Sequence, residues 1–278
     1  MKILITGGDG FFGRGLLPLF EKDGYSIMSC NKNKLNLLNI NNIKEILKKY
    51  SPDFIIHAAI CGKGKTNESK EIFYDNILSL ENLINCKEFY KGMIVFGSGA
   101  EFNRNNNIKN VLEENSCSMG VPTDSYGLSK YFQSIRIKEY DWITELIIFN
   151  CFGEYEDNNK FIKTAIINYI NKKSIEIFDD KTFDFFYIND LYQIILKCIS
   201  ESILYRKLNC CYNEKLKISD IANKINNLST YKVPIEIQQN TNISYTGNCE
   251  KINSLNLSFM GLDIGLQNCY HHILKMNE

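Results

Sequence analysis

The stretch KILITGGDGFFGRGLL, residues Lys2–Leu17, decides the fold class of this chain. A short apolar run typical of a strand leads into glycines spaced G-x-x-G-x-x-G, which open a helical pattern. Glycine there permits a tight turn, close approach of a pyrophosphate, and close packing of helix on strand. The free N–H groups at the helix start would then face the anion. We predict a dinucleotide-binding turn, with an ordinary strand-to-helix turn as the alternative. The residues expected to contact the cofactor are Gly7, Gly10, Phe11, Phe12 and Gly13.

Short apolar runs alternate with helical patterns through the first half of the chain. The runs are nearly continuously apolar, as strands buried on both faces of a sheet are. They are Lys2–Thr6, Tyr25–Cys30, Phe54–Ala59, Met93–Phe96 and Thr144–Phe149. The helical patterns between them are Gly13–Lys22, Ile43–Tyr50, Glu71–Cys86 and Tyr126–Tyr140. The alternation predicts an α/β fold, a doubly wound parallel sheet with helices on both faces.

After about Asn150 the alternation loosens, which indicates a smaller α/β region. Its expected helices are Phe161–Lys172, Asp190–Ser200, Ser219–Leu228 and Leu266–Lys275. Its expected strands are Ile175–Phe178, the FDFFYI run and Ile235–Gln238. We predict a dinucleotide-binding domain with the catalytic helix over residues 1–150. Residues 151–278 are expected to form mainly a substrate-binding region, with some segments returning to the first domain.

The composition argues against several classes of function. The 32 Lys and Arg residues balance the 32 Asp and Glu residues, so no basic field favours nucleic acid or anionic lipid. Three histidines, and ten scattered cysteines without C-x-x-C spacing, favour reduced thiols over a metal site or disulfides. The sequence has no apolar run of membrane-spanning length and no apolar leader after Met1. We expect a soluble cytoplasmic protein that binds no metal, nucleic acid or membrane.

The residues after the second predicted strand bear on the choice of nicotinamide cofactor. An NAD-specific site usually carries an acid there, which holds the ribose hydroxyls. This strand instead ends in Asn31-Lys32-Asn33-Lys34. The two ammonium groups lie where a 2′-phosphate would sit, so NADPH is predicted in preference to NADH. Asn31 and Lys32 are the expected contacts, and a merely solvated lysine loop is the alternative.

The segment Tyr126-Gly-Leu-Ser-Lys130 is the strongest candidate for catalysis. On a helix, positions i and i+4 share one face, so the phenol and the ammonium point into one site. The ammonium is expected to lower the pKa of the phenol, which could then act as acid or base.

The G-x-x-G-x-x-G turn and the Y-x-x-x-K segment together resemble the extended branch of the short-chain dehydrogenase/reductase superfamily. The resemblance covers essentially the whole chain, and the segment 34–60 is similar to that of GDP-L-fucose synthases. It implies that Asn36 and Leu37 line the adenine, that His57 is a sheet residue, and that Asn76 steadies the central strands. It also implies further cofactor contacts from Ala58, Ala59, Ile60 and Phe149. Ser98, four residues before an aromatic, carries over as the hydroxyl that binds the substrate oxygen.

The residues after Ser98 separate the reactions of this superfamily. Dehydratases carry an Asp-Glu pair directly after the hydroxyl residue, where this chain has Gly99 and Ala100. Epimerase/reductases use a cysteine and a histidine, and the resemblance implies that Ala100 and Phe161 stand at these two places. The resemblance thus implies hydride transfer without the epimerising pair, with Tyr155 as the nearby phenol that could replace it. The expected substrate contacts are Ser98, Gly99, Ala100, Asn150 and Phe161.

The resemblance implies NADPH-dependent reduction of the C4 ketone of a nucleotide-linked 4-keto-6-deoxy sugar, in surface polysaccharide biosynthesis. The sugar is expected to be GDP-linked, and C3 and C5 are expected to keep their configurations. A nucleotide-sugar 4-epimerase with tightly bound NAD is one alternative, and a non-catalytic dinucleotide-sensing protein is another. A homodimer through the helices Glu71–Cys86 and Tyr126–Tyr140 is also implied.

Overall fold

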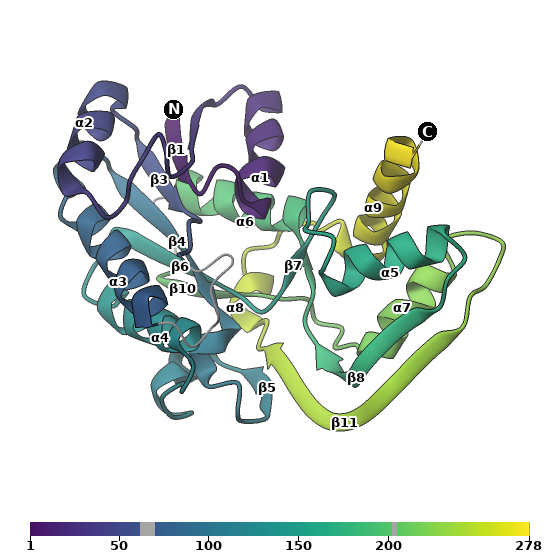
Figure 1. Cartoon of the computed structure of the whole chain (residues 1–278). Coiled ribbons are helices and arrows are strands. Elements are labelled where there is room, and N and C mark those ends of the chain that lie inside the picture. The colour runs from purple at the N-terminus through teal and green to yellow at the C-terminus, as the bar shows by residue number, and fades with distance from the viewer. Residues whose placement is uncertain (62–69, 202–204, 278) are drawn as a thin grey trace.

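A six-stranded parallel sheet forms the centre of the larger lobe in the computed structural model, which describes residues 1–61, 70–201 and 205–277 (Figure 1). Its strands lie in the order β10-β6-β4-β3-β1-β2. They are β1 (Lys2–Thr6), β2 (Ser26–Cys30), β3 (Phe54–His57), β4 (Gly92–Ser98), β6 (Ile143–Ile148) and β10 (Lys207–Cys210). Thr6 pairs with both Cys30 and His57, so the loops after β1, β2 and β3 start at one edge. The strand order reverses there, where doubly wound folds bind ligands.

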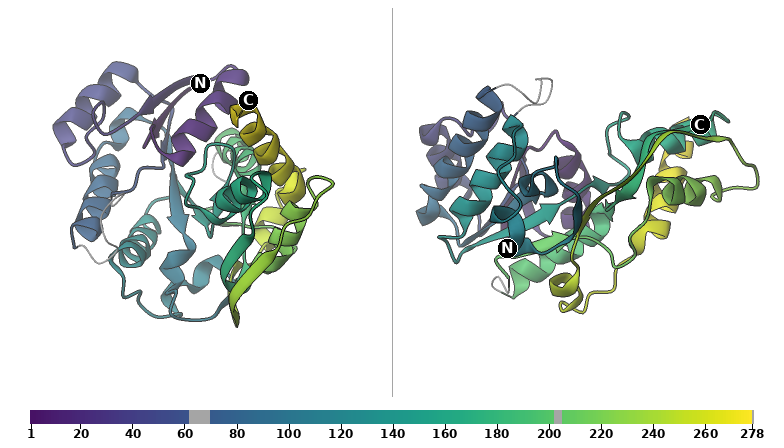
Figure 2. Two further views of the ribbon diagram at one scale, coloured as in Figure 1. Left: turned by 45° about the vertical axis from the view of Figure 1, so that its right-hand side comes forward. Right: turned by 90° about the horizontal axis from the view of Figure 1, so that it is seen from below.

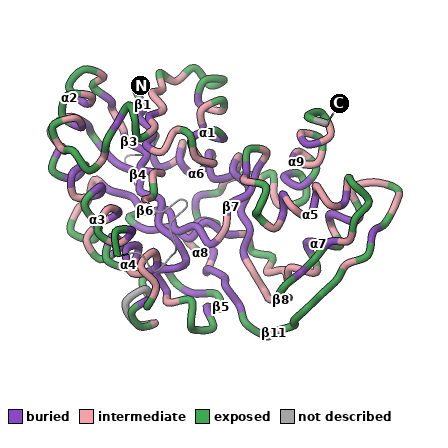
Figure 3. Tube along the Cα trace, viewed as in Figure 1, coloured by how far each residue is buried: buried purple, intermediate pink, exposed green. Residues whose placement is uncertain are grey.

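Helices cover both faces of this sheet. The helices are α1 (Phe11–Lys22) and α6 (Ile188–Ser200) on one face, and α2 (Ile40–Tyr50), α3 (Lys70–Ile84) and α4 (Ser125–Ile137) on the other. Alternate residues of β1 show the division, because Ile3 and Ile5 pack with α1 while Leu4 packs with α2. These side chains are fully buried, each worth about 2 kcal/mol of transfer free energy, and Figure 3 shows the buried sheet in purple.

A smaller lobe follows, and one long strand joins it to the first. Its helices are α5 (Phe161–Ile170), α7 (Ile218–Asn226) and α9 (Gly261–Asn277), while the short α8 (Glu250–Asn253) contacts β10 of the larger sheet. Its strands are β7 (Cys151–Phe152), β8 (Ile175–Phe183), β9 (Phe186–Tyr187) and β11 (Ile235–Gly247). β11 runs parallel to β8 across the bottom of Figure 1, and its last residues pair with β5 (Ile108–Val111) beside the larger lobe (Figure 2). Short 3-10 helices occupy Lys87–Phe89, Gly99–Phe102 and Glu113–Cys117.

The predicted fold class is confirmed, but the sequence missed or shortened several strands. β5, β7 and β10 are two to four residues long, and β10 (KLNC) is half polar. None of these three strands therefore gives a periodic hydrophobic signal. β8 extends five residues beyond the predicted Phe178, and β11 extends to Gly247. The middle of β11 is exposed and polar, and pairing with β8 rather than burial holds it extended. α6 packs against α1, and β10 pairs with β6, so both segments lie in the larger lobe although they follow residue 150. The division into two domains at residue 150 stays a prediction.

Among the described residues, no helix is both long enough and apolar enough to cross a lipid bilayer.

Candidate active site

The turn after β1 has the tight geometry that the glycines predicted. Gly7 has φ +76°, and a Cβ built on it would lie 2.9 Å from the Cα of Ala59. A Cβ on Gly13 would lie 2.5 Å from the carbonyl oxygen of Gly8. A side chain at either position would therefore push α1 or the end of β3 out of place, and the backbone would no longer form this cradle.

The N-terminus of α1 is open toward this cradle. Gly10 caps the helix without a side-chain hydrogen bond, and the first turn carries no acid. The first N–H groups are thus free to bind a diphosphate, so the residues present fit a dinucleotide. Phe11 and Phe12 start the helix with ring centroids 5.0 Å apart, and Phe12 packs edge-on against Phe96 at 4.7 Å.

The end of β3 lies directly under the glycine turn. Ala58 and Ala59 contact Gly7, and the Ala59 N–H donates to Thr6 Oγ1 at 3.1 Å. Ile60 is 52% exposed beyond them. Burial, with a smaller contribution from Lys130, lowers the pKa of His57 to about 3, so this imidazole is neutral near pH 7.

The segment after β2 contains a carboxylate neighbour that the sequence pattern did not show. The Asn31 side chain donates to Asp9 Oδ2 at 2.9 Å and accepts from the N–H groups of Asn33 and Lys34. Asp9 comes from the glycine turn, so an acid does approach the end of β2, although not from the expected place in sequence. Lys32 is exposed at this edge.

The two residues predicted to line the adenine lie just beyond this segment. Asn36 is exposed and its Oδ1 accepts from the N–H of Leu38 at 3.1 Å. Leu37 is half-buried against the core under α2, and its carbonyl accepts from Asn82 at 2.9 Å. Their contact with an adenine stays a prediction.

Ser98, Tyr126 and Lys130 come from the end of β4 and the start of α4. Asp124 caps α4 by accepting from the Gly127 N–H at 2.9 Å, which fixes Tyr126 in the first turn. Ser98 lies within hydrogen-bonding reach of the Tyr126 phenol. The Lys130 ammonium is buried and donates to the Phe96 carbonyl at 2.8 Å and to Gln133 at 3.2 Å. The structure therefore brings the hydroxyl and the phenol together, with the lysine one turn along α4.

The electrostatics of Tyr126 differ from the expectation. Burial raises the pKa of the phenol, and the Ser98 hydroxyl and the Arg104 guanidinium oppose that rise. Burial also lowers the pKa of Lys130 to about 8, against the attraction of two nearby glutamates. The Tyr126 pKa is therefore higher than that of a free tyrosine, and the expected lowering by Lys130 does not prevail. The phenol is protonated at neutral pH.

α3 supports α4, which carries Tyr126 and Lys130, through Asn76. Its side chain accepts from the Cys61 N–H at 2.8 Å, and its carbonyl accepts from Gln133 at 2.7 Å. This buried asparagine ties the segment after β3 to α4, close to the role that the resemblance implied.

The sequence analysis missed two side chains beside Ser98 and Tyr126. Tyr245, at the end of β11, places its hydroxyl 2.8 Å from where a Cβ on Gly99 would lie. Arg104 lies 6.0 Å from the Tyr126 ring centroid and forms an ion pair with Asp124 at 2.8 Å. The pairing of β11 with β5 and with β8 brings Tyr245 here. The sequence pattern did not indicate that parallel pairing.

The other predicted substrate residues are more dispersed. Ala100 is buried in the 3-10 helix after Ser98, and the Asn150 carbonyl accepts from the Phe186 N–H at 2.9 Å. Phe161 begins α5 and packs against Phe185 at 6.0 Å.

Two aromatic residues that were predicted to lie in the site have other surroundings than expected. Phe149, predicted to contact the cofactor, is buried between Phe102 and Tyr245. Tyr155 is 41% exposed, and its ring lies 5.4 Å from that of His272. The phenol found next to Ser98, besides Tyr126, is therefore Tyr245 and not Tyr155.

Among the described residues, no cluster of three or more His, Cys, Asp or Glu side chains could hold a metal ion. The site consists of a glycine cradle at a helix N-terminus, at the switch point of a parallel sheet, with a Ser, Tyr and Lys set at the neighbouring strand. This combination defines a dinucleotide-dependent oxidoreductase of the Y-x-x-x-K class.

The chain belongs to the NAD dependent epimerase/dehydratase family, which matches residues 3–211. The predicted recognition is confirmed, and the protein is an NAD(P)-dependent oxidoreductase. It is 26% identical over 254 residues to a GDP-6-deoxy-D-talose 4-dehydrogenase of Aggregatibacter actinomycetemcomitans, covering 86% of this chain and 83% of that protein. It is 24% identical over 223 residues to a GDP-L-fucose synthase of Azorhizobium caulinodans, covering 71% and 70%.

A GDP-mannoheptose C4 reductase from Campylobacter jejuni, solved with NADP bound, superposes with a TM-score of 0.83. The alignment covers 98% of each chain at 19% identity, which establishes a shared fold.

Proposed function

We propose that the protein reduces the C4 ketone of a nucleotide-linked 4-keto-6-deoxy sugar with NADPH, and leaves C3 and C5 unchanged. The observation that carries the proposal is the composition of the site around Ser98. The hydroxyl, the phenol and the lysine of a reductase are present, whereas Gly99 and Ala100 offer no group that could exchange a proton with the sugar ring.

The protonated phenol of Tyr126 is able to supply the proton that reduction of a ketone consumes. When bound, a nicotinamide cofactor would supply the hydride for C4. Ser98 binds the ketone oxygen, and Tyr126 gives its proton to the alkoxide that forms there. A phenol that starts protonated is suited to this step, because reduction consumes a proton at the substrate oxygen. Lys130 would hold the cofactor ribose and would stabilise the phenolate that remains.

The proposals for the nucleotide and for the pathway are inferred from the related proteins. Both curated relatives act on GDP-sugars by their names, and the superposed structure is a reductase of a GDP-linked heptose. We therefore propose a GDP-linked sugar as substrate, and a role in surface polysaccharide biosynthesis.

The preference for NADPH depends on opposing charges at the end of β2. Lys32 and Lys34 would attract a 2′-phosphate, while the carboxylate of Asp9 lies 2.9 Å from Asn31 and would repel it. Two cations against one anion favour NADPH, with NADH as the weaker cofactor. The lysines are exposed, so solvent screens their contribution and the preference should be moderate.

Asp9 also gives the 4-epimerase alternative its one specific support. An acid beside the ribose is typical of NAD enzymes, and 4-epimerases keep NAD bound through the catalytic cycle. Release of NAD from the purified, denatured protein in near-equal amount to the chain would favour that alternative.

The proposed reduction is tested by incubating the protein with NADPH and a panel of GDP-, dTDP- and UDP-linked 4-keto sugars. Consumption of NADPH is followed by absorbance, and products are identified by NMR. We expect turnover with a GDP-linked member. Absence of NADPH consumption across the panel would contradict the proposal.

We also propose a homodimer through α3 and α4, which lie side by side in Figure 1. Their outer surface exposes a row of large apolar side chains. Soluble monomers rarely expose a large contiguous apolar patch. They are Tyr74, Leu78, Phe132 and Ile135. Sedimentation should show a dimer for the wild type and a monomer for Phe132→Glu, and a monomeric wild type would contradict this proposal.

A further inference from the structure

The Ser98 hydroxyl is surrounded by more hydrogen-bonding groups than the catalytic set requires. It accepts from the Ala100 N–H at 3.2 Å, and it lies within hydrogen-bonding reach of the phenols of Tyr126 and Tyr245. A hydroxyl has one proton to donate and two lone pairs that accept. The way these three neighbours share them decides where the Ser98 proton points.

Tyr245 is held firmly in this place by aromatic packing. Its side chain is 9% exposed, with its ring edge-on to Phe149 at 5.2 Å and 4.9 Å from Phe183. β11 delivers it from the far lobe by pairing with β8 at Phe183 and with β5 at Ile108. The residue is therefore rigidly placed, although it lies far from Ser98 in sequence.

Gly99 leaves the space that the Tyr245 hydroxyl occupies. A Cβ at position 99 would lie 2.5 Å from the Phe149 ring and 2.8 Å from the Tyr245 oxygen. Any side chain at this position would push the phenol away from Ser98. Gly99, which stands where dehydratases carry an acid, therefore also leaves room for the Tyr245 phenol.

The Tyr245 hydroxyl keeps its proton through the physiological pH range. Burial raises its pKa well above that of a free tyrosine, and Arg104 and Ser98 offset only part of that rise. Tyr245 is thus always able to donate a hydrogen bond.

We propose that Tyr245 is a positioning residue that donates its hydroxyl proton to Ser98 and thereby turns the Ser98 proton toward Tyr126 and the substrate ketone. The Ala100 N–H and the Tyr245 O–H together occupy both lone pairs of Ser98. Its own proton then has no acceptor left except Tyr126 or the oxygen bound beside it. The chain of donors runs from Tyr245 to Ser98 to the substrate oxygen, which polarises the ketone before hydride arrives.

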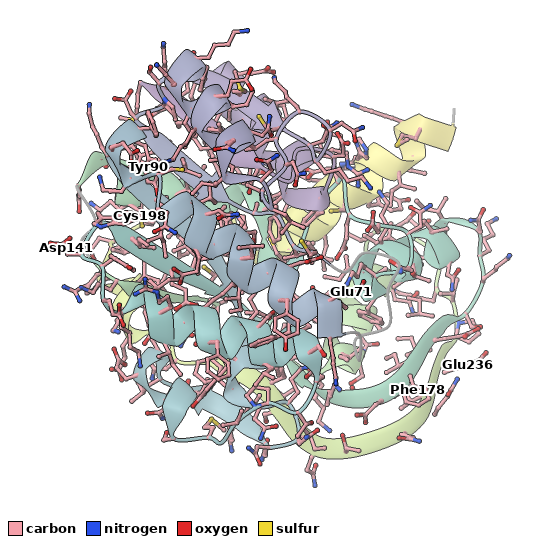
Figure 4. All side chains as sticks on the ribbon, turned by 60° about the vertical axis from the view of Figure 1, so that its left-hand side comes forward. Glu71, Tyr90, Asp141, Phe178, Cys198 and Glu236 are labelled. Atoms are coloured by element: carbon pink, nitrogen blue, oxygen red, sulfur yellow. The ribbon has the colours of Figure 1, made fainter. Side chains whose placement is uncertain are left out.

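This inference rests on the proposed reductase function for its kinetic test. Tyr245→Phe removes only the hydroxyl and keeps the ring between Phe149 and Phe183. We expect kcat to fall about tenfold, with KM within about twofold, since one hydrogen bond that orients a donor is lost. The matched control is Tyr90→Phe, which removes another buried phenol hydroxyl, bonded to the Leu83 carbonyl at 2.7 Å, on the loop before β4. Figure 4 labels Tyr90 at the opposite end of the molecule from Phe178 on β8. The control should keep wild-type kcat.

A double-mutant cycle with Ser98 separates positioning from general packing. In a Ser98→Ala background, Tyr245→Phe should change the residual kcat by less than about twofold, because the group it orients is absent. A full tenfold loss in that background, or a Tyr245→Phe enzyme as active as the Tyr90→Phe control, would overturn the inference.

Crystal structures of the wild type and Tyr245→Phe give a readout that needs no turnover. We expect the Ser98 hydroxyl to lie within hydrogen-bonding distance of Tyr245 in the wild type and to adopt another rotamer in the variant. If no 4-keto sugar is reduced but this rotamer change occurs, the proposed function fails and the hydroxyl arrangement stands. An unchanged rotamer would overturn the inference whatever the activity.

Discussion

The cofactor end and the ketone end of this site are built in opposite ways. At the cofactor end, backbone groups of one short turn form the cradle, and the absence of side chains at Gly7 and Gly13 makes it possible. At the proposed ketone end, Ser98, Tyr126 and Tyr245 come from β4, α4 and β11, and their side chains are expected to bind the ketone. The first kind of site depends on local conformation, and the second on long-range pairing of strands.

The largest expected effect is at the ketone end. Tyr126→Phe should lower kcat about a hundredfold or more, because the alkoxide loses its proton donor. The dissociation constant for NADPH, measured by fluorescence titration, should stay within about twofold, because the cradle is untouched. Near-wild-type turnover in this variant would remove Tyr126 from the mechanism.

A matched pair of glycines tests the cofactor end. Gly7 and Gly24 have nearly the same backbone conformation, with φ +76° and +77°, but a Cβ on Gly24 would meet nothing within 4 Å. Gly7→Ala should weaken NADPH binding roughly thirtyfold, because its methyl group collides with Ala59 in the cradle. Gly24→Ala should cost only about 1 kcal/mol of stability and leave NADPH affinity unchanged. Equal losses of affinity would mean that backbone strain, and not the contact with Ala59, matters.

A buried carboxyl on the segment between β7 and α5 gives a pH-dependent prediction. Burial raises the pKa of Glu156 from its usual 4.5 to about 8, and one of its oxygens has no hydrogen-bond partner. The folded protein therefore holds this proton to higher pH than the unfolded chain does. The free energy of unfolding should fall as pH rises from about 4.5 to about 8.

Glu156→Gln should reduce this pH-dependent fall in the free energy of unfolding by at least ~1 kcal/mol, measured by urea denaturation at pH 5 and pH 8. The control is Glu236→Gln on β11, labelled in Figure 4, where the carboxylate is exposed and the fall should be unchanged. The same fall in Glu156→Gln as in the wild type would show that this carboxyl does not titrate in the folded state.

The smallest expected effect concerns Asp9. Asp9→Asn should tighten NADPH binding about threefold and leave NADH affinity nearly unchanged, because one negative charge near the 2′-phosphate is removed. Lys32→Ala should have the opposite effect on NADPH. Titration of both cofactors into each variant checks this, and equal affinities of the wild type for the two cofactors would remove the argument from charge.

These two ends also show how far the sequence could predict the site. The tight geometry of the glycine turn could be predicted because it follows from residues that are neighbours in the chain, while its contact with a cofactor stays a prediction. Asp9 could not be predicted from the residues that follow β2, because its carboxylate reaches that place from the turn after β1.

Tyr245 was missed for a stronger reason. It lies at the end of a strand whose middle is polar and exposed, so no hydrophobic pattern indicated that the strand extends so far. Only the pairing of β11 with β8 and β5 places its hydroxyl beside Ser98.

We propose that the protein reduces C4 without proton exchange at the neighbouring carbons C3 and C5. Ala100 has no proton to exchange, Phe161 is equally inert, and Tyr155 lies beside His272, apart from Ser98. Exchange at C3 or C5 followed by inversion needs a base on one face of the ring and an acid on the other.

The most direct test is the reaction with NADPH in deuterated water, followed by NMR of the product. We predict a sugar reduced at C4 by unlabelled hydride, with no solvent deuterium at C3 or C5 above a control without enzyme. Deuterium at either carbon would show that other residues move protons there, and would contradict the account.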